Sequence, residues 1–108
     1  MSKRLSIVKI DASSVQGEGA YILWRRMTWG ERREVANDIR ADKVDVIAML
    51  LDLLQDWNWV DADGEKLPLP QVADDLERLY DEEVSFLADV GRRAIEGRLE
   101  FTLDAEKN

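Results

Sequence analysis

The stretch Val44-Asp-Val-Ile-Ala-Met-Leu-Leu-Asp-Leu-Leu-Gln-Asp-Trp57 decides the fold that the sequence predicts. Its aspartates, Asp45, Asp52 and Asp56, are seven and four positions apart, so they fall on one line of an α-helix. Nearly every other position is apolar, and a helix that is apolar over most of its circumference has to be covered from more than one side. We therefore expect a central buried helix over 44–57, which is too short and too acidic for a membrane span of about 20 residues.

The composition fits one folded domain and excludes several kinds of site. The chain has 108 residues, of which 45% are hydrophobic, and it contains neither cysteine nor histidine. Disulfides, thiolate metal ligands, cysteine nucleophiles and histidine bases are therefore excluded. The N-terminus is basic but lacks the apolar run of a signal peptide, so we expect a cytoplasmic protein. We also expect no cofactor and no metal ion.

The net charge of −8 is unevenly distributed along the chain. Residues 1–43 hold nine lysines and arginines against six acids, whereas residues 44–108 hold six against seventeen. Two interpretations stay open: the acids keep the surface soluble, or the two halves form faces of opposite sign that suit heterologous contacts. Because an acidic chain repels nucleic acid, we expect no nucleic-acid partner.

The first 40 residues predict a hairpin followed by a helix. Two short strands, over 5–10 and 20–24, are rich in β-branched or aromatic residues and flank a polar loop, so together they predict an N-terminal β-hairpin. Thr28 and Glu31 have the spacing of a capping box, which predicts a helix from about Trp29 to Arg40. Asp42 is the expected N-cap of the central helix that follows.

Two more helices are predicted in the second half of the chain, after a turn at Asp63-Gly64. Pro70 suits the first turn of one helix, whose apolar positions are Val72, Leu76 and Leu79. The other helix begins at Asp81 and ends at Gly97. Its predicted inward stripe consists of Val84, Leu87, Ala88, Gly91 and Ile95, which leaves Phe86 and Val90 partly exposed.

The predicted fold is therefore mainly α. It is a small bundle of four helices around a central apolar helix, with a short N-terminal β-hairpin. We expect a hairpin or extended segment over 1–27, a helical domain over 28–97 and a tail over 98–108.

Acidic residues crowd the last two predicted helices, between Asp74 and Asp89. Paired carboxylates can act as acid and base when their environments differ, so a carboxylate-dependent enzyme is one hypothesis. A solvated acidic face is the other interpretation, because nothing in the sequence indicates that such a pair is buried. Asp61-x-Asp63-Gly64 does not fit an EF-hand, because aligning it on the glycine puts Trp59 and Pro70 at ligand positions. We therefore expect no catalytic or metal site.

Aromatic and flexible apolar residues are the candidate contacts for a protein partner. We choose Trp29, Met49, Trp57, Trp59 and Phe86, because tryptophan dominates binding hot spots and methionine adapts to varied surfaces. For the tryptophans, a place in the core of a small domain is the alternative.

Four arginines, Arg25, Arg26, Arg32 and Arg33, cluster where the first helix begins. Their aromatic neighbours would suit a nucleic-acid site, but the acidic charge of the whole chain opposes it. Salt bridges to the acidic second half explain the cluster as well. For a protein partner, the same arginines would form a charge-steering face.

Two motifs resemble the tail assembly chaperones of long-tailed bacteriophages. They are Arg25-Arg-Met-Thr-Trp-Gly-Glu31 and Trp57-Asn-Trp-Val-Asp-Ala-Asp-Gly-Glu-Lys-Leu-Pro-Leu69, with an aspartate-rich helix between them and an acidic helix after them. The resemblance covers roughly residues 20–95. It implies a mostly helical, non-enzymatic protein of the infected bacterial cytoplasm.

The resemblance also implies partners. Such a chaperone coats the tape measure protein and helps to recruit tail tube subunits, and self-association is a further expectation. Three other classes stay open: an acidic mimic of nucleic acid that inhibits a nucleic-acid enzyme, another small helical interaction module, and the carboxylate-dependent enzyme.

Overall fold

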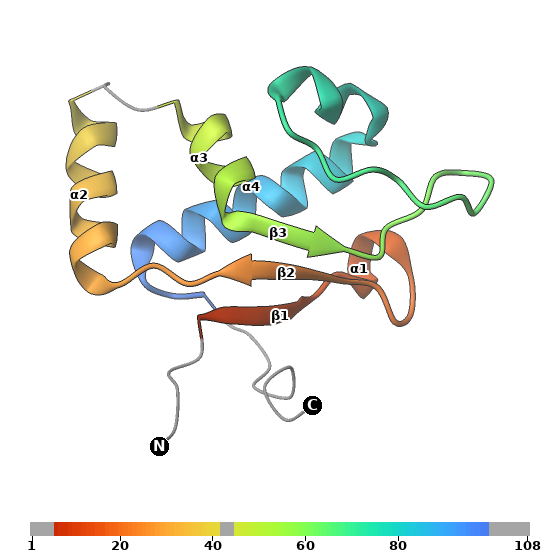
Figure 1. Cartoon of the computed structure of the whole chain (residues 1–108), viewed down its shortest axis with the longest axis horizontal. Helices are drawn as coiled ribbons and strands as arrows, with labels where there is room; N and C mark the ends of the chain where they lie inside the picture. The colour runs from red at the N-terminus through yellow and green to blue at the C-terminus, as the bar shows by residue number, and fades with distance from the viewer. Residues whose placement is uncertain (1–5, 42–44, 100–108) are drawn as a thin grey trace.

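Figure 1 shows the computed structural model of the chain, in which residues 6–41 and 45–99 are described. The described part combines a three-stranded antiparallel sheet, in the order β1-β2-β3, with helices beside and behind it. About 51% is helical and about 18% is strand. In chain order the elements are β1 (Ile7–Asp11), α1 (Ser13–Gln16), β2 (Tyr21–Arg25), α2 (Trp29–Arg40), α3 (Val46–Leu53), β3 (Leu54–Trp57), η1 (Ala73–Arg78) and α4 (Asp81–Glu96).

The predicted four-helix bundle is wrong, because the second half of the predicted central helix is a strand. The stretch changes from α3 to β3 between Leu53 and Leu54. β3 pairs antiparallel with β2, and Ile22 lies opposite Trp57. A short apolar run fits a buried helix or a buried strand, and here pairing with the free edge of β2 favours the strand. The fold is therefore α+β, with a sheet at its centre.

The predicted N-terminal hairpin is confirmed, and it supplies the other two strands of the sheet. β1 and β2 pair antiparallel, with Val8 opposite Trp24 and Ile10 opposite Ile22. These four side chains are buried and alternate with exposed or half-buried neighbours. One face of the sheet therefore carries the core, which the hairpin shares with α3 and α4. α4 crosses behind the strands in Figure 1.

The predicted start of α2 and the predicted end of α4 are confirmed. Thr28 Oγ1 accepts a hydrogen bond from the Glu31 backbone N–H, and Glu31 Oε1 accepts one from the Thr28 backbone N–H. This capping box begins α2. α4 ends at Gly97, whose φ of 74° lies in the left-handed region that glycine tolerates. The predicted turn at Asp63-Gly64 is also present.

The third predicted helix is a short 3₁₀ helix, η1, rather than an α-helix beginning at Pro70. The Asp75 carboxylate accepts hydrogen bonds from the backbone N–H groups of Gln71 and Val72, which tightens the chain just before η1. At the other end, the backbone of Leu79 is extended before α4 begins. Because these two constraints lie so close together, the segment does not extend into a longer helix.

α4 is rotated relative to its predicted stripe. The helix buries Glu83, Leu87, Val90, Gly91 and Ala94, whereas Ala88 is exposed. Positions 87, 90, 91 and 94 follow the spacing i, i+3, i+4 and i+7, so they form one face. That face belongs to the core, which is why Val90 is only 4% exposed instead of partly exposed as predicted.

Candidate protein-binding surfaces

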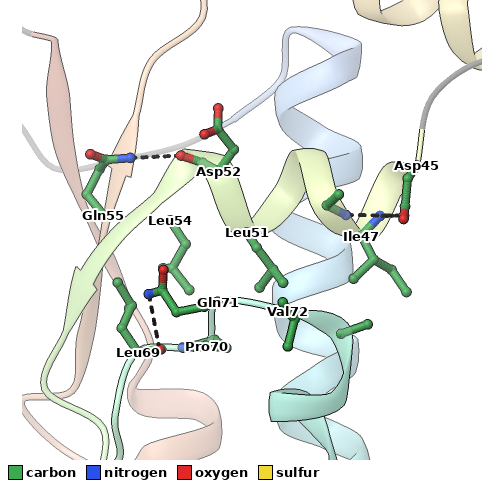
Figure 2. A pocket seen from close by; sticks show the side chains of 12 residues that line it. Asp45, Ile47, Leu51, Asp52, Leu54, Gln55, Leu69, Pro70, Gln71 and Val72 are labelled. Atoms are coloured by element: carbon green, nitrogen blue, oxygen red, sulfur yellow. Dashed lines mark hydrogen bonds between the residues drawn. The ribbon is translucent and has the colours of Figure 1, made fainter.

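A groove of about 480 Å³ lies between α3 and the segment 69–73. Figure 2 shows Ile47 and Leu51 on the side of α3 that faces the part of the segment carrying Val72, with Leu69 and Pro70 nearer to Leu54. We call this feature the α3 groove. Its lining consists of Asp45, Ile47, Ala48, Leu51, Asp52, Leu54, Gln55, Leu69, Pro70, Gln71, Val72 and Ala73.

The α3 groove is open to solvent and is lined by both polar and apolar side chains. Leu51, Leu54 and Pro70 are buried members of its lining. Ile47 on the helix is 45% exposed, and Val72 on the facing segment is 58% exposed. Exposed apolar side chains that gather in a hollow are typical of interaction surfaces.

Both charged residues in the lining are aspartates. Asp45 caps α3, since its Oδ1 accepts hydrogen bonds from the backbone N–H groups of Ile47 and Ala48 at 3.1 and 3.2 Å. Asp45 therefore has the N-cap role that was predicted for Asp42, which lies outside the described residues. Asp52 has a side chain that is 78% exposed and pairs with Arg25 at 3.7 Å. An exposed pair at this distance contributes little to stability, and the Asp52 carboxylate remains accessible to a second cation.

Asp75 holds the segment opposite α3 in place. Its carboxylate accepts hydrogen bonds from the backbone N–H of Gln71 at 2.9 Å and of Val72 at 3.3 Å. These bonds lower the pKa of Asp75 below its ordinary value, so the carboxylate stays charged at neutral pH. The position of Val72 is therefore fixed by a charge-assisted bond to its backbone.

A second exposed surface lies on α2, a helix that buries no residue. Trp29 is 63% exposed, and the guanidinium carbon of Arg33 lies 4.7 Å from the centroid of its ring. Arg40 lies on the same line of the helix, because positions 29, 33 and 40 fall within about 40° of one another. Within the described part of the chain, neither Arg33 nor Arg40 forms an ion pair. We call Trp29, Arg33 and Arg40 the α2 stripe.

The other predicted contact residues lie wholly or partly in the core. Trp57 is 2% exposed and Trp59 is fully buried, and their rings stack with centroids 4.5 Å apart. We therefore withdraw both as contact residues, because a buried indole does not reach a partner. Met49 and Phe86 are half-buried against the core, and Phe86 packs on Trp59. Of the five predicted apolar contacts, Trp29 is the one with an exposed side chain.

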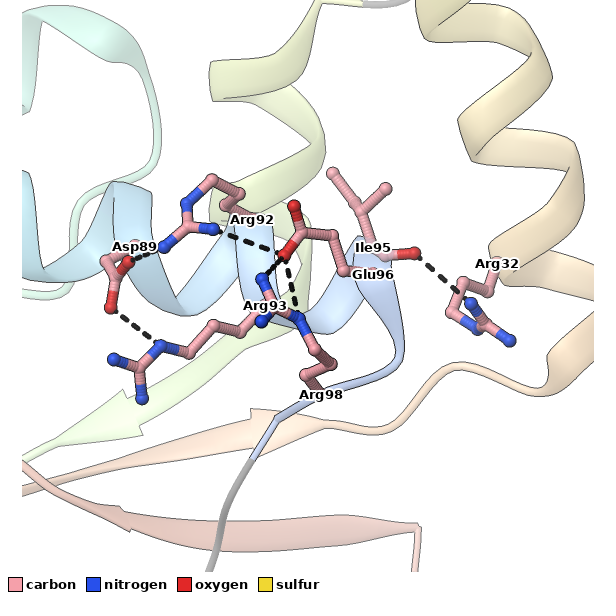
Figure 3. Close-up of polar contacts among 7 residues, drawn as sticks. All are labelled: Arg32, Asp89, Arg92, Arg93, Ile95, Glu96 and Arg98. Carbon is pink, nitrogen blue, oxygen red and sulfur yellow. Dashed lines mark hydrogen bonds and ion pairs between the residues drawn. The ribbon is translucent and has the colours of Figure 1, made fainter.

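The four predicted arginines do not form one face. Arg25 pairs with Glu31 at 3.3 Å and with Asp52, which confirms a salt bridge between the basic and acidic halves. Figure 3 shows Arg32 donating to the backbone carbonyl of Ile95, near the end of α4. Arg33 covers the ring of Trp29, and Arg26 is also engaged in an interaction.

The acids at the end of α4 pair with arginines on the same helix and just after it. Asp89 and Glu96 both bind Arg92, and Glu96 also binds Arg98 (Figure 3). The hydrogen bond from Arg98 and the charge of Arg98, followed by the charge of Arg92, lower the pKa of Glu96. Among residues 6–41 and 45–99, no cluster of three or more acids is arranged to hold a metal ion.

Glu83 is buried, which the sequence did not indicate. It is 4% exposed, and its carboxylate accepts hydrogen bonds from Gln16 Nε2 and from the Tyr80 backbone N–H. The Gln16 amide also exchanges two hydrogen bonds of 2.9 Å with the backbone of Val60. Glu83 therefore ties α1 and the chain around residue 60 to α4, which is a structural role.

Comparisons with known proteins found no match: no family model, no curated protein and no solved structure is similar to this chain. Among the described helices, none has both the length and the hydropathy that a bilayer span requires.

Sequence patterns did not indicate the α3 groove. They placed Ile47 in a central helix covered from more than one side, and they placed Val72 among the apolar positions of another helix. The one available signal was the run Leu67-Pro-Leu-Pro70, in which each residue before a proline has to be extended. An extended segment leaves the neighbouring side of α3 less completely covered than a packed helix does.

Proposed function

We propose that this chain is a non-catalytic tail assembly chaperone of a long-tailed bacteriophage. It acts in the infected bacterial cytoplasm, binds the tape measure protein and helps to recruit tail tube subunits. The observation that carries the proposal is the presence of two separate exposed surfaces, the α3 groove and the α2 stripe, on one small domain. A protein that coats a long helical partner in many copies needs more than one contact surface on each copy.

Both motifs of the family resemblance help to build these surfaces. The capping box of Thr28 and Glu31 begins the helix that displays Trp29. In the second motif, Trp57 and Trp59 anchor the chain in the core, and the Nε1–H of Trp57 donates to the Leu67 carbonyl at 3.0 Å. This contact positions the run that leads into the segment facing α3. The motif residues therefore act mainly by holding in place the segments that carry the two surfaces.

Co-expression with the neighbouring tape measure protein tests the proposal. We expect the soluble fraction of that protein to rise severalfold when this chain is present. The double variant Trp29→Ala/Ile47→Lys removes one exposed apolar side chain from each surface and should lose most of the effect. Val60→Lys is the matched control, because Val60 is 37% exposed and lies outside both surfaces.

The proposal fails if the tape measure protein is no more soluble with the wild-type chain than without it. It also fails if the double variant and the control solubilise that protein equally well, because the two surfaces then have no part in binding.

A further inference from the structure

We infer that the α3 groove of one copy of this chain binds the α2 stripe of a second copy, so that copies associate head to tail. The inference deepens the proposed function, because copies that coat a long partner side by side contact one another. Its test uses the purified chain alone, so that its outcome is independent of the tape measure protein.

The two surfaces are complementary in chemistry. The α2 stripe presents an exposed indole with Arg33 and Arg40, and these two cations form no ion pair within residues 6–41 and 45–99. The α3 groove presents exposed aliphatic side chains, and its charged lining residues are Asp45, which also caps α3, and Asp52, which is 78% exposed and also pairs with Arg25 at 3.7 Å. Each surface therefore offers the charge that the other lacks, together with apolar area for the other to cover.

The spacing of the charges also matches. Arg33 and Arg40 are seven positions apart on α2, and Asp45 and Asp52 are seven positions apart on α3 and its N-cap. At 1.5 Å per residue, each pair is separated by about 10 Å along its helix axis. Two helices that lie side by side can therefore form both charge pairs at once.

The position of Trp29 selects the relative direction of the two helices. When the helices are antiparallel, Arg40 lies near Asp45 and Arg33 near Asp52. Trp29, one turn before Arg33, then lies beyond Asp52, where Leu54 and Leu69 line the groove. When they are parallel, Trp29 lies beyond Asp45, away from that apolar lining. The geometry therefore favours antiparallel helices with the indole between Leu54 and Leu69.

The contact forms between copies rather than within one copy. In Figure 1, α3 lies between α2 and the segment that leads into η1, and the α3 groove lies between α3 and that segment, so α2 of the same copy is on the other side of α3. Because the groove and the stripe are different patches, the contact is heterologous. Each added copy leaves one groove and one stripe free, so association continues beyond a dimer unless a ring closes.

Sedimentation equilibrium of the purified chain, with charge-reversed variants, tests the inference. We expect the average mass of the wild type to rise with protein concentration, and to rise less at high salt. Asp52→Arg and Arg33→Asp should each weaken association by about tenfold, because an attractive pair becomes a repulsive one. An equimolar mixture of the two variants, and a chain carrying both substitutions, should recover association, because opposite charges meet again.

The apolar part of the contact has its own variant and control. Trp29→Ala should weaken association by more than about tenfold, since a tryptophan that is buried on binding between apolar side chains is a typical hot spot. Tyr80→Ala removes an aromatic side chain of similar exposure, 62%, outside both surfaces and should leave association unchanged. Circular dichroism of every variant checks that the fold is retained.

Three outcomes would overturn the inference: a wild-type chain that stays monomeric at millimolar concentration, reversed variants that associate like the wild type, or a double reversal that restores nothing. None of these depends on the tape measure protein. Self-association without solubilisation of the tape measure protein would support the inference and contradict the proposed function. Solubilisation without self-association would support the proposed function and contradict the inference.

Discussion

α4 and α2 are the two longest described helices and pack against each other, yet they relate to the core in opposite ways. α4 buries Glu83, Leu87, Val90, Gly91 and Ala94. α2 buries no residue and is held by its capping box, its half-buried side and the hydrogen bond from Arg32 to the end of α4. One helix therefore stabilises the fold, whereas the other displays side chains to solvent.

Truncating a buried side chain of α4 should have the largest effect. Leu87 is 1% exposed, so Leu87→Ala should lower the free energy of unfolding by about 2–5 kcal/mol through lost burial and a cavity. Ile39→Ala, on the half-buried side of α2, should cost about 1 kcal/mol or less. Urea unfolding of both variants measures the difference. Equal losses would contradict the division of roles between the helices.

The next effect concerns the beginning of α4, where Gln16 holds the buried carboxylate of Glu83. Gln16→Ala should cost about 1–3 kcal/mol, because it removes a partner of that carboxylate and two hydrogen bonds to Val60. Gln55→Ala is the matched control, since Gln55 is exposed and its amide donates to the carbonyls of residues 52 and 53, two and three positions earlier in the chain. If both variants unfold at the same urea concentration, Gln16 does not tie α1 to α4.

A smaller and more local effect is expected at the start of α2. Thr28→Ala removes the hydroxyl that accepts from the Glu31 backbone N–H, and losing such a cap costs about 1 kcal/mol. Because α2 buries no residue, the cost should appear as local opening. Hydrogen exchange should become severalfold faster in the amides of α2 and stay unchanged in those of α4. A uniform acceleration in both helices would show that they open together.

Sequence reasoning succeeded where the signal is local and failed where distant segments decide. The capping box of Thr28 and Glu31, the stop at Gly97 and the N-terminal hairpin follow from neighbouring residues, and all three are confirmed. The change from helix to strand after Leu53 depends on pairing with β2, which lies about 30 residues earlier in the chain. No periodicity within the stretch itself indicates that it pairs with β2.

The candidate surfaces divide in the same way. Trp29, a predicted contact residue, is the first residue of α2 and is exposed. Trp57 and Trp59 are two positions apart, and in an extended chain both rings turn to the core, where they stack. The α3 groove needs the positions of two segments separated by about 20 residues, so it became visible only in the folded chain.

The smallest expected effect is the dependence of α2 on pH. A hydrogen bond from the Thr28 backbone, followed by one from Arg25, lowers the pKa of Glu31 below its ordinary value. A carboxylate whose pKa is lower in the folded state stabilises that state above its unfolded pKa, and the contribution disappears as pH falls through the folded pKa. The contribution of Glu31 to α2 is therefore complete at neutral pH and lost in acid.

Cα chemical shifts of α2, followed from neutral pH into acid, measure this contribution. The wild type should lose helicity at the start of α2 as Glu31 is protonated, whereas Glu31→Gln should begin with lower helicity and change less. The two chains should therefore converge in acid. Glu34→Gln, one turn further along α2, is the control, because Glu34 forms no hydrogen bond or ion pair with the described residues. If Glu31→Gln follows the wild-type curve throughout, the charge of Glu31 does not hold the start of α2, and the cap depends on Thr28 alone.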